Sequence, residues 1–150
     1  MQNSESNANK SSRGNLFNQN VTQQLQQLLY RQKIKKFYLE PRYNYPSKEI
    51  EQFSPDGEIT LLNDNIIVYD NTTTIRHDRL KGKLWDAYGV KEHFRAKEKE
   101  IKYYVIIPDD ISAKELKNAI GEQEKLNNPE YYSSINDIIT LTKLIAILDD

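Results

Sequence analysis

The sequence predicts an α/β domain in which a small mixed β-sheet is flanked by helices. Apolar residues recur at helical spacing near the N-terminus, an Asn/Asp turn joins two β-rich runs, and helical and strand-like segments alternate in the second half. A chain of 150 residues suits one domain. We expect it to span residues 14–150, because residues 1–13 are rich in Asn and Ser and predict a disordered arm.

The first half of the chain predicts a helix and then a strand. Phe17, Val21 and Leu25 recur at three- to four-residue spacing, which is typical of an amphipathic helix. Phe37 alternates with more polar neighbours in a short strand that stops at Pro41. The expected bounds are residues 15–32 for the helix, 35–42 for the strand and 43–53 for an irregular connection.

A β-hairpin follows, with strands at residues 59–62 and 66–69 joined by Asn63-Asp64-Asn65. Pairing the strands about a turn centred on Asp64 places Asp56 opposite Thr72, with Asp70 diagonally within reach.

The second half alternates helices and strands. Residues 101–107 form a nearly continuous apolar run, which is typical of a central strand covered on both faces. Ser112 and Glu115 match a capping box at the start of a helix, and Thr142 is expected to cap the last helix. The expected elements are helices over residues 78–94 and 112–126, strands over 101–107 and 138–141, and a final helical turn through residue 148.

Composition excludes several classes of protein. The chain has no cysteine, which rules out disulfide scaffolds, thiolate metal sites and thiol nucleophiles. Its 21 basic and 22 acidic residues give a net charge of -1, so a global field that attracts nucleic acid or anionic lipid is absent. No apolar run approaches the roughly 20 residues of a membrane span. We therefore expect a soluble, cytoplasmic protein that does not act at a membrane.

Asp56 and Asp70 are the candidate catalytic pair. Two carboxylates at the same end of a hairpin can share a hard divalent cation, which prefers oxygen ligands and keeps several waters. The alternative is structural: Asp56-Gly57 is a turn, and Asp70 ends a strand.

Pro55-Asp56, a hairpin and an apolar strand that ends Asp70-Asn71-Thr72 resemble the PD-(D/E)XK signature of restriction-like endonucleases. The segment around Asn18 resembles the first helix of that family, and the later helix and buried strand stand where the restriction-endonuclease-like core has them. The resemblance implies that Asp56 and Asp70 bind Mg²⁺, which activates a water and polarises the scissile phosphate.

Two positions depart from the family pattern. The family lysine falls at Thr72, which cannot supply a positive charge, and the first-helix glutamate falls near Asn18, a neutral oxygen ligand. Lys81 and Lys83 on the following helix are candidates for the missing charge, and Lys81 is the one that we expect to be catalytic. Two basic stretches are expected to contact DNA phosphates, because few acidic residues dilute them. The expected DNA-binding residues are Arg31, Lys33, Lys35, Lys36, Arg76, Arg79 and Lys83.

The resemblance implies a Mg²⁺-dependent endonuclease that hydrolyses double-stranded DNA at a specific site. Restriction enzymes and the intron-encoded homing endonucleases of the cyanobacterial type both use this fold, and the sequence leaves that choice open. Because one chain carries one site and two strands must be cut, a homo-oligomer (a dimer or a tetramer) is expected. The alternative is a non-catalytic DNA-binding or assembly subunit with a degenerate nuclease fold, which the loss of the lysine at Thr72 favours.

Overall fold

A computed structural model describes residues 7–44, 52–74, 77–94, 99–111, 114, 117 and 135–150. The three helices with assigned bounds in these residues are α1 (Asn7–Tyr30), α2 (His77–Phe94) and α4 (Leu141–Asp149). The strands are β1 (Lys36–Leu39), β2 (Tyr43–Asn44), β3 (Gln52–Phe53), β4 (Gly57–Thr60), β5 (Ile66–Asn71), β6 (Ile101–Ile107) and β7 (Asp137–Thr140).

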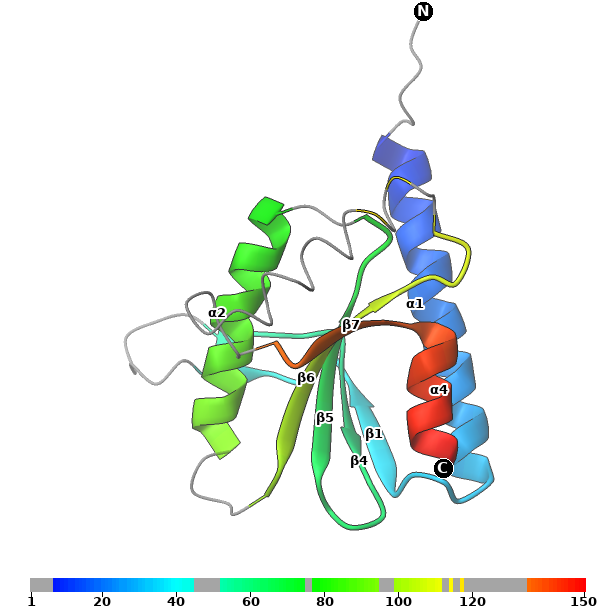
Figure 1. The fold of residues 1–150 in the computed structure, drawn as a ribbon, viewed down its shortest axis with the longest axis vertical. Coiled ribbons are helices and arrows are strands. Elements are labelled where there is room, and N and C mark those ends of the chain that lie inside the picture. The colour runs from blue at the N-terminus through cyan, green and yellow to red at the C-terminus, as the bar shows by residue number, and fades with distance from the viewer. Residues whose placement is uncertain are drawn as a thin grey trace, which may run out of the picture.

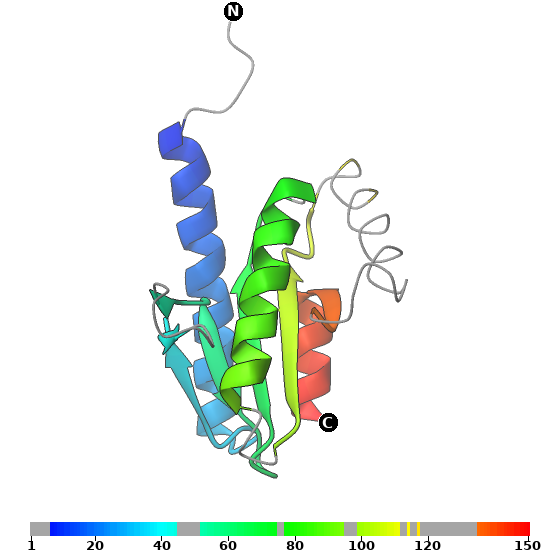
Figure 2. The ribbon, with the colours of Figure 1, turned by 90° about the vertical axis from the view of Figure 1, so that its left-hand side faces the viewer.

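A five-stranded mixed sheet with the order β1-β4-β5-β6-β7 forms the centre of the molecule. The β1–β4 and β4–β5 pairs are antiparallel, whereas β5–β6 and β6–β7 are parallel. Helix α2 covers one face of the sheet, and α1 and α4 lie side by side on the other (Figures 1 and 2). The predicted α/β class, with a small mixed sheet and flanking helices, is confirmed.

Strand alternation divides the apolar residues between these two layers. Ile67 and Tyr69 of β5 face α1 and α4, where they join Phe17, Val21 and Leu25 in one buried cluster. The neighbouring β5 residues Ile66 and Val68 face α2 and pack in a second cluster whose members from that helix are Ala87, Val90 and Phe94. Residues on both faces of β5 and β6 are therefore buried, which explains why the run at residues 101–107 is almost uninterrupted by polar side chains.

The hairpin register differs from the expected one. Gly57 pairs with Tyr69 and Thr60 pairs with Ile66, so β4 ends at Thr60 and a five-residue loop replaces the expected three-residue turn. The Leu61 N–H donates to the Asn65 carbonyl at 2.8 Å, which closes this longer loop. The prediction that Asp56 faces Thr72 was therefore wrong.

Several element bounds also differ from expectation. Helix α1 begins at Asn7, so it includes the second half of the segment predicted to be a disordered arm. The N-cap of α4 is Thr140 and not Thr142, because the Thr140 hydroxyl accepts the Lys143 N–H at 3.2 Å. Thr142 instead donates both its N–H and its hydroxyl to the Asp109 carboxylate.

The segment between β1 and the main hairpin contains a two-stranded sheet of β2 and β3, where an irregular connection was expected. The capping box at Ser112 and Glu115 and most of the helix predicted over residues 112–126 lie outside the described residues.

Candidate functional site

Asp56 and Asp70 lie together at the end of the hairpin opposite its loop. The Asp56 N–H donates to Asp70 Oδ1 at 3.2 Å and to the Tyr69 carbonyl at 3.1 Å. Asp56 directly precedes β4, and Asp70 is the fifth residue of β5, so the hairpin register places the two residues opposite each other. The two predicted metal ligands are brought together, and more closely than the expected diagonal arrangement would have placed them.

The Asp70 carboxylate is buried and contacts two further elements. Its residue is 7% exposed. The Tyr103 hydroxyl of β6 donates to Oδ2, and the Lys83 ammonium of α2 lies 3.5 Å from the same oxygen. Burial and the negative charge of Asp70 raise the pKa of the Tyr103 hydroxyl well above 10, so the phenol stays protonated and keeps donating. Asp70 therefore sits beside one positive charge, that of Lys83, and accepts from two neutral donors, the Asp56 N–H and the Tyr103 hydroxyl.

Asp56 has fewer partners. Its Oδ2 accepts the Asn71 N–H at 2.6 Å, and within the described part of the chain no donor contacts Oδ1. Burial raises the pKa of the Asp56 carboxyl above its ordinary 3.8, and the Asp70 charge adds to this, while the Asn71 N–H and the Lys83 charge oppose it. A half-buried carboxylate with unused lone pairs is a group that a cation would stabilise.

Lone-pair arithmetic ranks the two carboxylates as metal ligands. An ionised carboxylate has about four acceptor sites. Asp70 uses two of them in hydrogen bonds with the Asp56 N–H and Tyr103, and its Oδ2 also faces the Lys83 ammonium at 3.5 Å, whereas Asp56 uses one. Asp56 therefore has room for a divalent cation, and Asp70 has room for one bond to it.

Asn71 connects the pair to α1. Its side-chain Nδ2 donates to Asn18 Oδ1 at 3.0 Å, while its own Oδ1 is buried and has no hydrogen-bond partner. An unpaired buried amide oxygen costs free energy unless a donor or cation reaches it. Asn18 thus lies one side chain away from the carboxylates.

Thr72 does not provide a group to the site. It is 8% exposed, and its hydroxyl donates to the Thr74 carbonyl at 2.6 Å and accepts the Thr74 N–H at 3.3 Å. The backbone N–H of Thr72 donates to the Ile106 carbonyl of β6. This residue closes the turn after β5, which is a structural role.

The positive charge at the site belongs to Lys83, which was a candidate beside Lys81 for the missing charge and was expected to contact DNA phosphates. Lys83 lies on the α2 face of the sheet, and its side chain is 20% exposed. Lys81, the expected replacement for the family lysine, is also on α2, but its side chain and that of Arg79 lie outside the described residues, as does Arg76 entirely.

The first predicted basic cluster lies at the other end of the sheet. Lys36 pairs with Thr60 next to the hairpin loop. Thr60 is four strand residues, or about 14 Å, from Asp56. Surface ion pairs and one ring contact occupy these cations: Arg31 and Lys33 with Asp149, Lys35 with Asp64 at 2.6 Å, and Lys36 over the Tyr38 ring. Few acidic residues were expected near this cluster, and the fold brings Asp64 and Asp149 to it.

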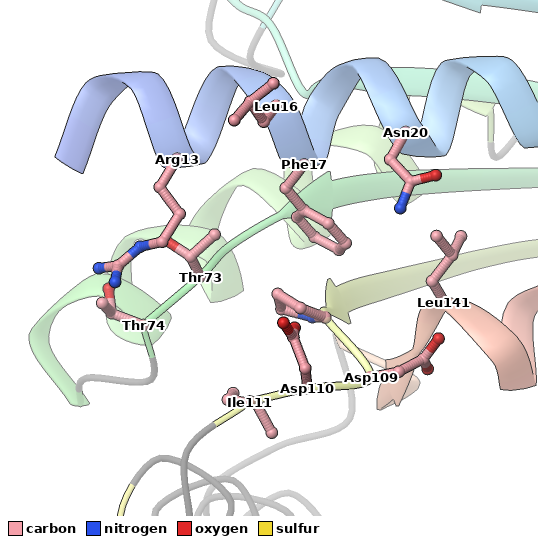
Figure 3. A pocket seen from close by; sticks show the side chains of 11 residues that line it. Arg13, Leu16, Phe17, Asn20, Thr73, Thr74, Asp109, Asp110, Ile111 and Leu141 are labelled. Carbon is pink, nitrogen blue, oxygen red and sulfur yellow. The ribbon is translucent and has the colours of Figure 1, made fainter. Parts of the chain in front are cut away.

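A pocket of about 650 Å³ opens where β5 and β6 end, between those strand ends and α1. Its lining does not include Asp56 or Asp70. The labelled side chains come from α1, from the turn after β5, from the segment after β6 and from the start of α4 (Figure 3): Arg13, Leu16, Phe17, Asn20, Thr73, Thr74, Asp109, Asp110, Ile111 and Leu141. In open α/β sheets, ligands commonly bind beyond the carboxyl ends of parallel strands, and this pocket has that position.

Sequence reasoning placed Tyr103 in the apolar run at residues 101–107 and missed its contact with Asp70. Parallel pairing of β5 with β6 places Tyr103 beside Val68, two residues before Asp70 on the same face, and a tyrosine side chain spans that distance. The strand pattern gave the face of Tyr103, but only the parallel register identifies its partner.

Within the described ranges, no group of three or more His, Cys, Asp or Glu residues could hold a metal ion. Any cation at this site would therefore have two carboxylate ligands and bound waters, a ligand set that suits Mg²⁺.

Among the described helices, none has the length and hydropathy needed to cross a bilayer. Comparison of the chain with protein-family models, with curated proteins and with solved structures finds no match in any of the three.

Proposed function

We propose that the protein is a Mg²⁺-dependent endonuclease of the restriction or homing type, with a restriction-endonuclease-like core, that acts on double-stranded DNA. The observation that carries this proposal is the contact between Asp56 and Asp70, with the Lys83 ammonium 3.5 Å from Asp70. The order of helix, antiparallel strands, helix and parallel buried strand agrees with the resemblance of the Pro55-Asp56 and Asp70-Asn71-Thr72 segments to that superfamily.

The residues present fit a magnesium ion. Asp56 offers unused carboxylate lone pairs, Asp70 offers one more, and the raised pKa of Asp56 reflects a burial cost that a bound cation would remove. When bound, Mg²⁺ lowers the pKa of a coordinated water and polarises the phosphate. Asp56 and Asp70 would hold it, and Tyr103 would fix the orientation of Asp70 by donating to Oδ2.

Lys83 takes the role that the family lysine has at the position of Thr72. An ammonium at this place attracts the scissile phosphate and offsets negative charge that develops during attack by water. It reaches the site from α2 and not from β5, and because its side chain is 20% exposed, a phosphate can approach it from solvent.

The test is cleavage of a mixed library of linear double-stranded DNA by the full chain in Mg²⁺ or Mn²⁺, with binding measured in Ca²⁺. The Asp56→Asn and Asp70→Asn variants keep the side-chain size and remove the charge, so cleavage should fall by roughly 100-fold or more while binding in Ca²⁺ persists. Lys83→Met should lose a similar factor. Asp64→Asn and Lys102→Met, which alter exposed ion pairs with Lys35 and Glu100 respectively, are matched controls and should cut normally.

Cleavage that persists in Asp70→Asn would remove this residue from the active site. The second candidate function is a non-catalytic DNA-binding or assembly subunit, which the involvement of Thr72 in its own turn favours. A wild-type chain that binds DNA and never cuts it, in either metal, would establish that alternative.

A further inference from the structure

Asn71 is the last residue of β5 and directly follows Asp70. Strand alternation places its side chain on the face of the sheet that α1 covers, whereas Asp70 contacts Lys83 of α2 on the other face. The backbone N–H of Asn71 donates to Asp56 Oδ2 at 2.6 Å, and the Asp56 N–H donates to Asp70 Oδ1 at 3.2 Å. Asn71 therefore lies beside the carboxylate pair, on the opposite side of Asp56 from Asp70.

The two ends of the Asn71 amide have different surroundings. Its Nδ2 donates to Asn18 Oδ1 of α1 at 3.0 Å, and this bond fixes which end of the amide faces α1. Its Oδ1 is buried, and no donor contacts it among the residues that the structure describes. Buried polar atoms in folded proteins almost always have a partner, which is commonly a bound water or ion where the protein supplies none. The Asn71 side chain thus lacks one donor, which a ligand can supply.

A cation at the carboxylate pair would bring such a donor within reach. Asn71 Oδ1 is four covalent bonds from the nitrogen that contacts Asp56, so it lies at most about 7 Å from Asp56 Oδ2. Mg²⁺ keeps several waters at about 2.1 Å, and each water donates over about 2.8 Å, so the ion and its waters reach acceptors about 5 Å from the ion. One water of the ion is therefore sufficient to satisfy Oδ1.

We propose that Asn71 is a third residue of the cation site, and that its Oδ1 accepts a hydrogen bond from the water shell of a Mg²⁺ ion held by Asp56 and Asp70. This inference rests on the proposed function, because it assumes that the two carboxylates bind the ion. The alternative role of the side chain is structural, as a bridge between β5 and α1 through Asn18. The two roles predict different effects of substitution.

The test is Mn²⁺ binding to the full chain without DNA, measured by isothermal titration calorimetry, because Mn²⁺ prefers the same oxygen ligands as Mg²⁺. Asn71→Leu replaces the amide with an apolar group of similar size. It should weaken Mn²⁺ binding by roughly tenfold, as loss of a supporting hydrogen bond at a metal site usually does. Asp56→Asn should weaken binding at least as much. Asp64→Asn removes an exposed carboxylate that pairs with Lys35, and this control should bind Mn²⁺ normally.

Thermal unfolding in metal-free buffer separates the two roles of the side chain. Asn71→Leu removes a buried oxygen that lacks a donor together with the bond to Asn18, so its Tm should not fall. Asn18→Leu removes the acceptor of Nδ2 and leaves Oδ1 in place. Its Tm should fall, whereas its Mn²⁺ affinity should change less than that of Asn71→Leu. Asn71→Asp keeps an oxygen at this position and should bind Mn²⁺ at least as tightly as wild type, which tests the same role if the leucine variant does not fold.

Equal Mn²⁺ affinity in wild type and Asn71→Leu would overturn the inference. So would weaker binding by Asn71→Asp than by wild type, or a wild type that binds no Mn²⁺ up to about 10 mM. The cleavage assay decides the proposed function separately. Cleavage by wild type, with Mn²⁺ affinity that does not depend on Asn71, would refute this inference alone, whereas Mn²⁺ binding that depends on Asn71 without any cleavage would refute the nuclease alone.

Discussion

Replacement of Gly57 by alanine tests the hairpin register that positions Asp56. Gly57 is buried and pairs with Tyr69 across the β4–β5 ladder. A methyl group on Gly57 would overlap the Cζ, Oη and Cε1 atoms of the Tyr69 ring, which is 1% exposed and enclosed by the core. Under the register expected from sequence, position 57 would face Asn71 and an alanine there would be tolerated.

The expected loss of folding free energy in Gly57→Ala follows from the two ways of removing this overlap. Expelling the Tyr69 ring would expose about 150–250 Å² of surface, which costs roughly 4–6 kcal/mol at about 25 cal/mol per Å². A shift of β4 and its neighbours, with the ring kept inside, costs about 1–3 kcal/mol, as overpacking usually does. The second route is cheaper, so we expect Gly57→Ala to destabilise the fold by about 1–3 kcal/mol, or a fall in Tm of roughly 3–10 °C.

Gly14→Ala is the matched control, because the same chemical change should stabilise the fold at this position. Gly14 lies within α1, and no heavy atom outside its own helix backbone and its chain neighbours lies within 4 Å of the position of the added methyl group. Alanine in a helix interior is more favourable than glycine by about 0.5–1 kcal/mol. Thermal unfolding followed by circular dichroism measures both variants. A Gly57→Ala protein as stable as wild type would refute the register.

Three further predictions concern stability. Thr140→Ala removes the N-cap of α4 and should cost about 1 kcal/mol, seen as a decrease in the midpoint of urea unfolding; no change would mean that Asp109 caps this helix alone. Because the pKa of Asp56 is raised in the folded protein, folding stability should fall as pH rises from the unfolded value of 3.8 through the folded value. In metal-free buffer, Asp56→Asn should remove this fall in stability. The Tm of this variant should exceed that of wild type most at neutral pH, and the two Tm values should converge near pH 3. An equal difference in Tm at both pH values would contradict burial as the cause of the raised pKa. Tyr103→Phe leaves the buried Asp70 carboxylate without its hydroxyl donor and should destabilise the protein by about 1–3 kcal/mol, whereas an unchanged Tm would show that this hydrogen bond contributes nothing.

Local pattern was sufficient to identify the main elements and the layers. The spacing of Phe17, Val21 and Leu25 gave the buried side of α1, and the unbroken apolar run at residues 101–107 gave a strand buried on both faces. These features were predictable because periodicity records which side of an element meets the core, whatever the core's detailed packing. The proximity of Asp56 and Asp70 was predictable for a related reason, since one hairpin carries both.

The register, by contrast, depends on how the chain closes. The Leu61–Asn65 hydrogen bond, together with Asp64 in a left-handed conformation (φ 72°), shifts the pairing by two residues from a turn centred on Asp64. The three residues Asn63-Asp64-Asn65 are compatible with either loop. A shift of the strand pairing by two residues also leaves the same side chains on each face of the sheet. Only the packing of Tyr69 over Gly57 and the closed loop distinguish them.

The partners of the charged residues were likewise decided by tertiary structure. Lys83 reaches Asp70 because of the rotation of α2 about its own axis where the helix packs on the sheet. The periodicity of a sequence does not define that rotation closely enough to say which single side chain reaches the site. Lys33 and Lys35 are neutralised by Asp149 and Asp64, which lie 116 and 29 residues away along the chain. The sequence by itself determined which faces are buried and which residues are charged, whereas the fold decided which charges meet, because Coulomb attraction depends on distances that only the packed elements set.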